Sequence, residues 1–318
     1  TNLAVGNYAL DALTSGDQNV GLGHNALGGT TTGGNNIGVG VAAGMANTTA
    51  SNNVAIGTTS LRTNTTGADN VAVGHAALYT NNGANNVAVG RGSMFANTTG
   101  ADNVSVGMNS LDANTTGASN IAVGKEALGN NTTASYNTAL GMNSMLTNTV
   151  AENNTAVGYE SLKVMTGTGD GRNTAIGFQS GVALTTGNRN VFAGSVSGQA
   201  VTTGDKNVLI GNNAGGSITT VDDIVAIGAG ALDSNTSGTL NTAVGTNALA
   251  GNTTAANNTA VGHSALLVSS TGAGNTAVGK SALAANTTAA NNVAVGLNSL
   301  AANTTGASNT AIGKATLD

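Results

Sequence analysis

The amino-acid sequence predicts an all-β fold, a parallel β-solenoid or β-roll of nineteen coils of about 17 residues each. Three observations carry this prediction. One short repeat fills the chain, the repeat is rich in Val, Thr, Asn and Gly, and charged residues make up only 7% of the sequence, against roughly 25% in an ordinary soluble domain. A repeat this short is too small for a pair of helices and fits one coil of a solenoid.

The composition excludes several other classes of protein. The 318 residues include no Cys, which rules out disulfides and thiolate metal sites, and no Pro, which with only 48 Gly rules out collagen. A hydrophobic fraction of 40% argues against disorder. The net charge of −5 gives no basic footprint for nucleic acid, and no apolar run reaches membrane-span length.

The repeat is centred on a pentapeptide of the type NVAVG, whose Gly is taken here as position zero. Nineteen copies run from Gly6 to Gly313, and sixteen of the eighteen intervals are 17 residues. One deletion precedes Gly90 and one insertion precedes Gly177. The repeat therefore predicts a single array over residues 1–318, with no second domain.

Each coil is expected to contain one main strand, the pentapeptide, which ends at the Gly where the backbone must turn. The β-branched residues of the pentapeptide favour a strand. A coiled coil is excluded because the sequence has no heptad pattern.

Charged residues occupy few columns of the repeat, and positions −4 to −1, +3 and +4 carry none. Because burying an unpaired charge is costly, these columns are predicted to be buried. Positions −3 and −1, such as Val71 and Val73, alternate with −4 and −2 and so face the other way. We expect them to form the coil's own core together with Leu78 and the other Leu residues at +4.

The opposite strand face, with Asn at −4 and mostly Ala at −2, is then expected to pack against other chains, with Asn forming a stacked ladder. A monomer whose coil folds over this face is the alternative. The predicted subunit-interface residues are Asn53, Ala55, Asn70, Ala72, Asn103, Asn120 and Ala122.

The motifs NVAVG, NTAVG and NTAIG followed by xx[AS]L resemble the head repeats of YadA-like trimeric autotransporter adhesins, and equally repeats of phage and bacterial tail fibres. The resemblance covers the full chain, although this period is longer than the adhesin one and the NTTG return segment is extra. It implies three chains about a common axis, with the aliphatic pair Val71 and Val73 and its equivalents turned inward.

The sequence offers no catalytic group, metal site or cofactor site. His24, His75 and His263 all stand at +1, too many coils apart for one chain to bring two of them to a metal. The acids are scattered, which disfavours a carbohydrate-cleaving enzyme with paired carboxylates. We therefore expect a protein that is not an enzyme.

Residues 163–224 depart from the pattern in a coherent way. Three coils replace the +4 Leu by Gly and place an aliphatic residue at +7, as in Leu184. Arg172, Arg189 and Lys206 stack at −5 on successive coils of this segment. They form a candidate site for an anionic glycan, and the alternative is that Asp170, Asp205 and Asp223 neutralise them as surface pairs.

These observations predict the shaft of a homotrimeric fibre, a structural and adhesive protein of a tail fibre or bacterial surface. It is expected to be extracellular, on a cell surface or virion, and to bind a cell-surface glycan or protein receptor, without nucleic acid or membrane insertion. The alternative function is a monomeric ice-binding solenoid that uses its Thr ladders, such as Thr65 and Thr66.

Overall fold

A computed structural model, which describes residues 1–317, confirms the all-β parallel solenoid, and these residues contain no helix. The chain divides into two compact units, Thr1–Asn154 and Thr155–Asp318. Both are built from the same coil, which consists of a short strand, a six-residue turn and an irregular return segment.

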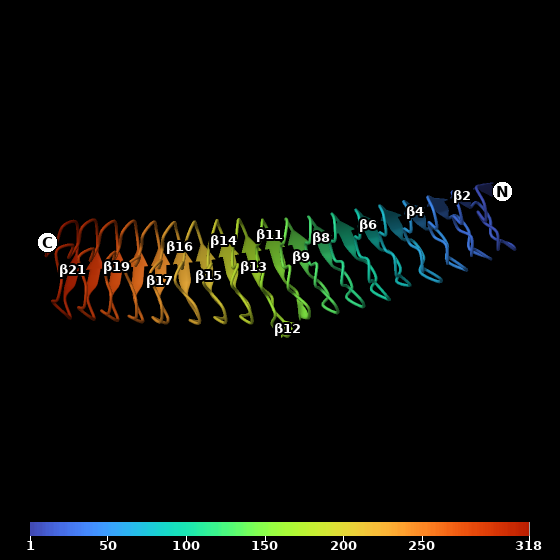
Figure 1. Ribbon diagram of the computed structural model, residues 1–318. Coiled ribbons are helices and arrows are strands. Elements are labelled where there is room, and N and C mark those ends of the chain that lie inside the picture. Colours follow the sequence, from blue (N-terminus) through green and yellow to red (C-terminus); the bar gives the residue numbers. More distant parts are fainter. Residues whose placement is uncertain (318) are drawn as a thin grey trace. The chain divides into compact units, whose positions relative to one another are not determined.

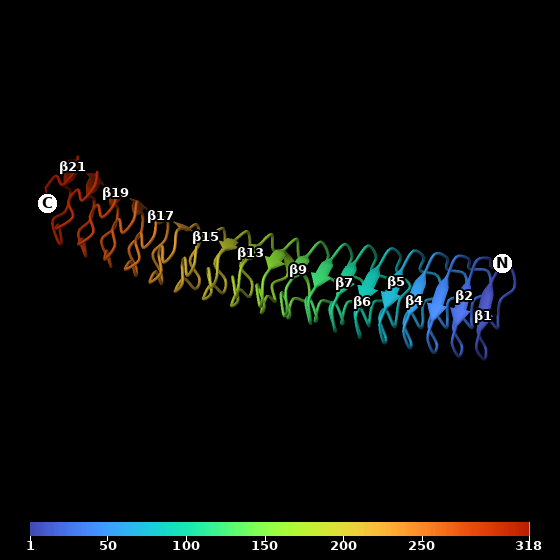
Figure 2. The ribbon, with the colours of Figure 1, turned by 90° about the horizontal axis from the view of Figure 1, so that it is seen from above.

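The strands follow one another in chain order within each unit (Figures 1 and 2). The first unit contains β1 (Leu3–Val5), β2 (Val20–Leu22), β3 (Ile37–Val39), β4 (Val54–Ile56), β5 (Val71–Val73), β6 (Val87–Val89), β7 (Val104–Val106), β8 (Ile121–Val123), β9 (Thr138–Leu140) and β10 (Ala151–Glu152). The second contains β11 (Thr155–Val157), β12 (Gly169–Asp170), β13 (Thr174–Ile176), β14 (Val191–Ala193), β15 (Val208–Ile210), β16 (Val225–Ile227), β17 (Thr242–Val244), β18 (Thr259–Val261), β19 (Thr276–Val278), β20 (Val293–Val295) and β21 (Thr310–Ile312).

The three-residue strands pair in parallel with equivalent repeat positions opposite each other. Val54 lies opposite Val71, and Ala55 lies opposite Ala72. The register also survives the one-residue deletion, since Val71 lies opposite Val87. Identical side chains are thereby stacked in columns along each unit.

The interior of the coil is narrow and is filled by small side chains and one Leu. In every three-residue strand from β2 to β21, the middle residue at −2 is buried and its two neighbours are half-buried or exposed. Opposite this residue, the +4 side chain points inward, as Leu61 and Leu78 do with at most 1% exposure. The prediction that the +4 Leu residues are core is confirmed for every coil except the last, in which Leu317 is exposed.

The prediction for the two strand faces is wrong, because the faces are exchanged. All seven residues assigned to a subunit interface lie inside the chain's own coil with at most 1% exposure: Asn53, Ala55, Asn70, Ala72, Asn103, Asn120 and Ala122. The side chains assigned to the core, at −3 and −1, line the outside of the sheet. A 17-residue coil has room for Ala opposite Leu, whereas a pair of Val or Ile side chains would overfill it.

Asn side chains at −4 form a hydrogen-bonded ladder, interrupted at Ile224, but they form it inside the coil. The backbone N–H of Asn70 donates to Asn53 Oδ1 at 3.0 Å, and Asn70 Nδ2 donates to the Gly83 carbonyl at 2.9 Å. A second ladder runs at +7, where Asn114 Nδ2 donates to Asn97 Oδ1 at 2.8 Å. The ladders satisfy buried backbone groups that no strand partner reaches.

The Gly at position zero is required by close contact between coils. Gly57 has φ +127°, and a Cβ on it would lie 2.5 Å from the carbonyl oxygen of Gly74. A side chain there would clash with rigid backbone, so neighbouring coils can approach only if this residue is Gly.

The variant coils within residues 163–224 have a rearranged interior, as their sequence predicts. Leu184 and Val201, at +7, are fully buried where other coils place Asn. The space left by the missing +4 Leu is taken by Phe192 and Leu209, which replace Ala at −2 and are also fully buried. Phe192 and Leu209 thus fill the space of the missing +4 Leu. The sequence predicted only the change at +7 in the turn.

Candidate functional surfaces

The outer face of the sheet presents a regular surface in each unit. We call it the aliphatic face, defined by the side chains at −3 and −1 of every three-residue strand. Ile121 is 44% exposed and Ile176 is 48% exposed. Its most exposed members are Leu3, Val5, Ile37, Ile56, Val106, Ile121 and Leu140 in the first unit and Ile176, Ile227, Val261, Val278 and Ile312 in the second.

The aliphatic face is regular and uncharged. Its side chains stand in two columns because equivalent residues are in register, and neighbouring strands of a sheet lie ~4.8 Å apart. Val, Ile, Leu and Thr fill nearly all of its positions, and none carries a charge. Large exposed apolar surfaces are uncommon on monomeric soluble proteins.

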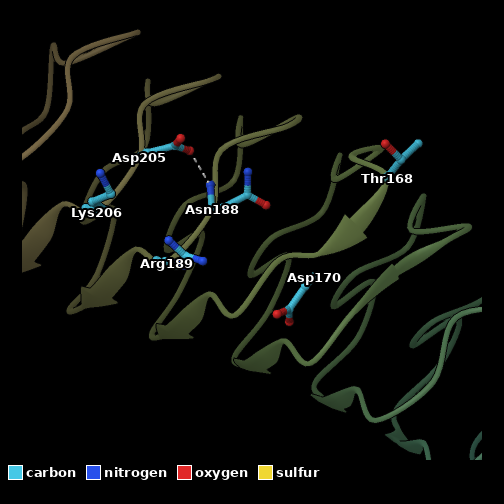
Figure 3. Close-up of a pocket in the computed structure, with 6 residues that line it drawn as sticks. All are labelled: Thr168, Asp170, Asn188, Arg189, Asp205 and Lys206. Atoms are coloured by element: carbon cyan, nitrogen blue, oxygen red, sulfur yellow. Dashed lines mark hydrogen bonds between the residues drawn. The ribbon is translucent and has the colours of Figure 1, made fainter.

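The cations predicted to stack at −5, Arg172, Arg189 and Lys206, which we call the cationic stripe, lie partly in a groove of about 270 Å³ in the second unit. Arg189 and Lys206 line it together with Asp170 from the inserted segment, and these three residues come from successive coils (Figure 3). Arg172 is instead paired with Asp170, at 2.5 Å between Nε and Oδ2. The structure therefore brings two of the three predicted cations into one groove.

The carboxylates beside the cationic stripe mostly accept hydrogen bonds from backbone N–H groups rather than pair with the cations. The Asp205 carboxylate accepts the Asn188 N–H at 2.7 Å (Figure 3). Asp222 accepts the Asp205 N–H, also at 2.7 Å. Among residues 1–317, neither Arg189 nor Lys206 forms an ion pair. Of the three neutralising pairs considered from the sequence, the structure forms only the one made by Asp170.

Within residues 1–317, no group of three or more His, Cys, Asp or Glu side chains could hold a metal ion. The same residues include no helix long and apolar enough to cross a membrane. His24, His75 and His263 are all exposed.

Sequence reasoning missed one cluster, on the turn segments of the first unit. Tyr79 and Phe95 stand at +5 on consecutive coils and their rings stack, with centroids 4.8 Å apart. The signal was present in the repeat alignment, where two aromatic residues follow each other in one column.

No family model matches this chain, and no curated protein matches it.

Proposed function

We propose that this chain is the shaft of a homotrimeric, extracellular fibre on a bacterial surface or a virion, and that it acts in attachment rather than catalysis. The observation that carries the proposal is the aliphatic face. A thin coil cannot cover this face with its own residues, since the 17-residue repeat is already used for the strand, turn and return segments. Partner chains would remove it from water.

One apolar face per coil supports an assembly of three chains. Each coil presents one such face, so three parallel chains can turn all three faces toward a common axis and leave no apolar face outside. Three chains about a common axis are also what the resemblance to the adhesin-head repeats implies. Apolar contact repeated coil after coil would suit a stiff shaft, because every coil adds the same interface.

The mass of the protein in solution tests the assembly. Light scattering is expected to give about three times the chain mass of 30.4 kDa. The double variant Val87→Glu/Val89→Glu is expected to dissociate the trimer, since burying unpaired carboxylates is costly. The matched control Thr99→Glu lies on an exposed turn and should remain trimeric. A wild-type monomer or dimer contradicts the proposal.

Attachment is proposed to involve a sulfated, sialylated or phosphorylated glycan at Arg189 and Lys206, with Arg172 beside them. Both groove cations lack an ionic partner among the described residues. Neighbouring like charges repel each other, and a bound anion would relieve that repulsion.

Binding to heparin oligosaccharides and to sialyllactose tests this site. The triple variant Arg172→Ser/Arg189→Ser/Lys206→Ser should lose binding, and raised salt should weaken wild-type binding. The control Lys280→Ser/Lys314→Ser removes two cations elsewhere on the second unit and should bind as wild type does. Equal binding by the triple variant rejects the site.

The ice-binding alternative receives less support from the Thr ladders. In most pairs the hydroxyl of the first Thr donates a hydrogen bond within the solenoid, as when Thr48 Oγ1 donates to the Thr65 carbonyl at 3.0 Å. The second Thr of each pair, such as Thr66, is exposed, whereas the first is half-buried in most pairs, although Thr98 is exposed. An ice-recrystallisation assay separates the two functions, because inhibition by a monomeric wild-type protein would favour the alternative.

A further inference from the structure

A stacked pair of aromatic side chains lies on the turn segments of the first unit. Tyr79 and Phe95 stack with an interplanar angle of 15°. On the preceding coil, Arg62 donates a hydrogen bond to the Tyr79 hydroxyl, and its guanidinium carbon lies 5.4 Å from the Tyr79 ring centroid. Tyr79 is thus held from one side by Arg62 and from the other by Phe95. Phe95 ends the stack and is 40% exposed.

The free side of Phe95 opens onto a groove. The next coil places Asp112 in the same +5 column. The residue that follows Phe95 in this column is therefore an acid rather than a third aromatic residue. Phe95 and Asp112 line a groove of about 290 Å³ together with Arg91 and Asn109. A second groove of about 180 Å³ adjoins it and shares Asn109 and Asp112.

Gly92 lines the first groove without a side chain that would fill part of it. Its φ is +64°, and a Cβ there would lie 2.8 Å from Asn109 Oδ1. Most coils carry a larger residue at this +2 position. The absence of a side chain leaves the Asn109 amide accessible from the groove.

Asp112 is the unusual polar group of this surface. Its side chain is half-buried, and burial raises the pKa of the carboxyl above its usual value. Among residues 1–317, its carboxylate accepts no hydrogen bond and forms no ion pair. A partly dehydrated carboxylate without a partner gains free energy from any ligand that donates hydrogen bonds to it.

We propose that this groove binds a neutral hexopyranose unit of a glycan. The apolar C–H face of the sugar would lie on the exposed face of Phe95, whose π-electrons favour positively polarised edges. Two vicinal hydroxyls would donate to Asp112, and Asn109 and Arg91 would hydrogen-bond the remaining hydroxyl and ring oxygens. A cationic ligand fits less well, because the Arg91 guanidinium shares the groove. The proposal rests on the attachment function and adds a second, neutral ligand class to it.

The absence of Trp from the chain provides a direct assay. The variant Phe95→Trp places a single Trp in the groove, where sugar stacking would change its fluorescence. The probes are the methyl glycosides of glucose, galactose, mannose, fucose and N-acetylglucosamine. At least one is expected to give a saturable change, and saturation-transfer NMR with wild-type protein should show contact with the same glycoside.

Two further variants locate the binding. Asp112→Asn in the Phe95→Trp background should weaken affinity at least tenfold, whereas Asp11→Asn, an exposed acid in the same +5 column, should leave it unchanged. No saturable change with any of the five glycosides, or equal affinity in the Asp112→Asn protein, overturns the proposal. Light scattering on the same samples keeps the two proposals separate, since a trimer that binds no glycoside rejects this groove and leaves the shaft intact.

Discussion

A Cβ on Gly181 would lie 2.6 Å from Cδ2 of Phe192, so the smallest residue of the turn and the largest buried residue of the strand occupy one volume. Gly198 on the next coil stands in the same relation to the other edge of the ring. In ordinary coils the same volume is filled by Leu at +4 and Ala at −2. The interior volume is therefore filled in both kinds of coil, but the large side chain comes from the turn in ordinary coils and from the strand in this one.

The first prediction exchanges the members of this pair. Phe192→Ala is expected to cost about 3–5 kcal/mol, because it leaves a cavity beside two glycines. Gly181→Leu alone should also destabilise by about 1–3 kcal/mol through overpacking. The double variant should recover stability, since Leu61 and its equivalents already adopt the positive φ required at +4. Urea unfolding measures the coupling, and strictly additive effects would contradict the shared volume.

The second prediction concerns the Asn ladder. Asn103 Oδ1 accepts the buried N–H of Asn120 at 2.9 Å, so Asn103→Ala should cost about 1–3 kcal/mol by leaving that donor unpaired. Asn130→Ala removes an exposed Asn and is the control.

Ile224 provides the reverse experiment, because it occupies position −4 without an acceptor for the following coil. Ile224→Asn should extend the ladder and raise the unfolding midpoint. A lower midpoint for Ile224→Asn, or no loss for Asn103→Ala, would show that the ladder contributes little.

The third prediction is a pH dependence centred on Glu160. Its carboxylate accepts hydrogen bonds from Lys163 Nζ at 2.7 Å and from Gln179 Nε2 at 2.8 Å. These contacts, that of Lys163 first, lower the pKa of Glu160 from 4.5 to about 2. Because the folded pKa lies below the unfolded one, the stabilisation is present above pH 4.5 and is lost as the pH falls toward 2.

Thermal unfolding of wild type and Glu160→Gln at pH 6 and pH 2.5 measures this effect. The wild type should be the more stable protein at pH 6, and the difference should shrink at pH 2.5. A difference that is constant with pH would assign the effect of the substitution to something other than this charge.

The fourth prediction compares two glycines that both have positive φ. Gly107→Ala should prevent correct stacking of the coils, since its Cβ would lie 2.5 Å from the Gly124 carbonyl oxygen. The Cβ of Gly169→Ala would meet no atom within 4 Å. This substitution should therefore destabilise the fold only by the cost of holding Ala at positive φ, about 1–2 kcal/mol. Circular dichroism and unfolding midpoints distinguish them, and similar losses would mean that backbone conformation, rather than contact between coils, sets the need for Gly at position zero.

Much of the fold could be predicted from the repeat, because its spacing and composition are local properties of the chain. The candidate surfaces were predicted less well. Arg189 and Lys206 were found because like charges in one column must stack, and Phe95 could have been found in the same way. The repeat offered Asp170, Asp205 and Asp223 as alternative partners of the cations. It could not show that only Asp170 forms such a pair, with Arg172, since that contact depends on the path of the inserted residues.

The sequence by itself determined the coil, its period, the strand in each coil and the Gly at its end, because periodicity and backbone preference are written in the order of residues. Only the tertiary structure decided which strand face is inside. Both faces are free of charge, so the absence of charge could not distinguish Val71 from Ala72. The volume enclosed by a 17-residue coil makes that distinction: it admits Ala and hydrogen-bonded Asn opposite Leu, and it turns the larger aliphatic side chains outward.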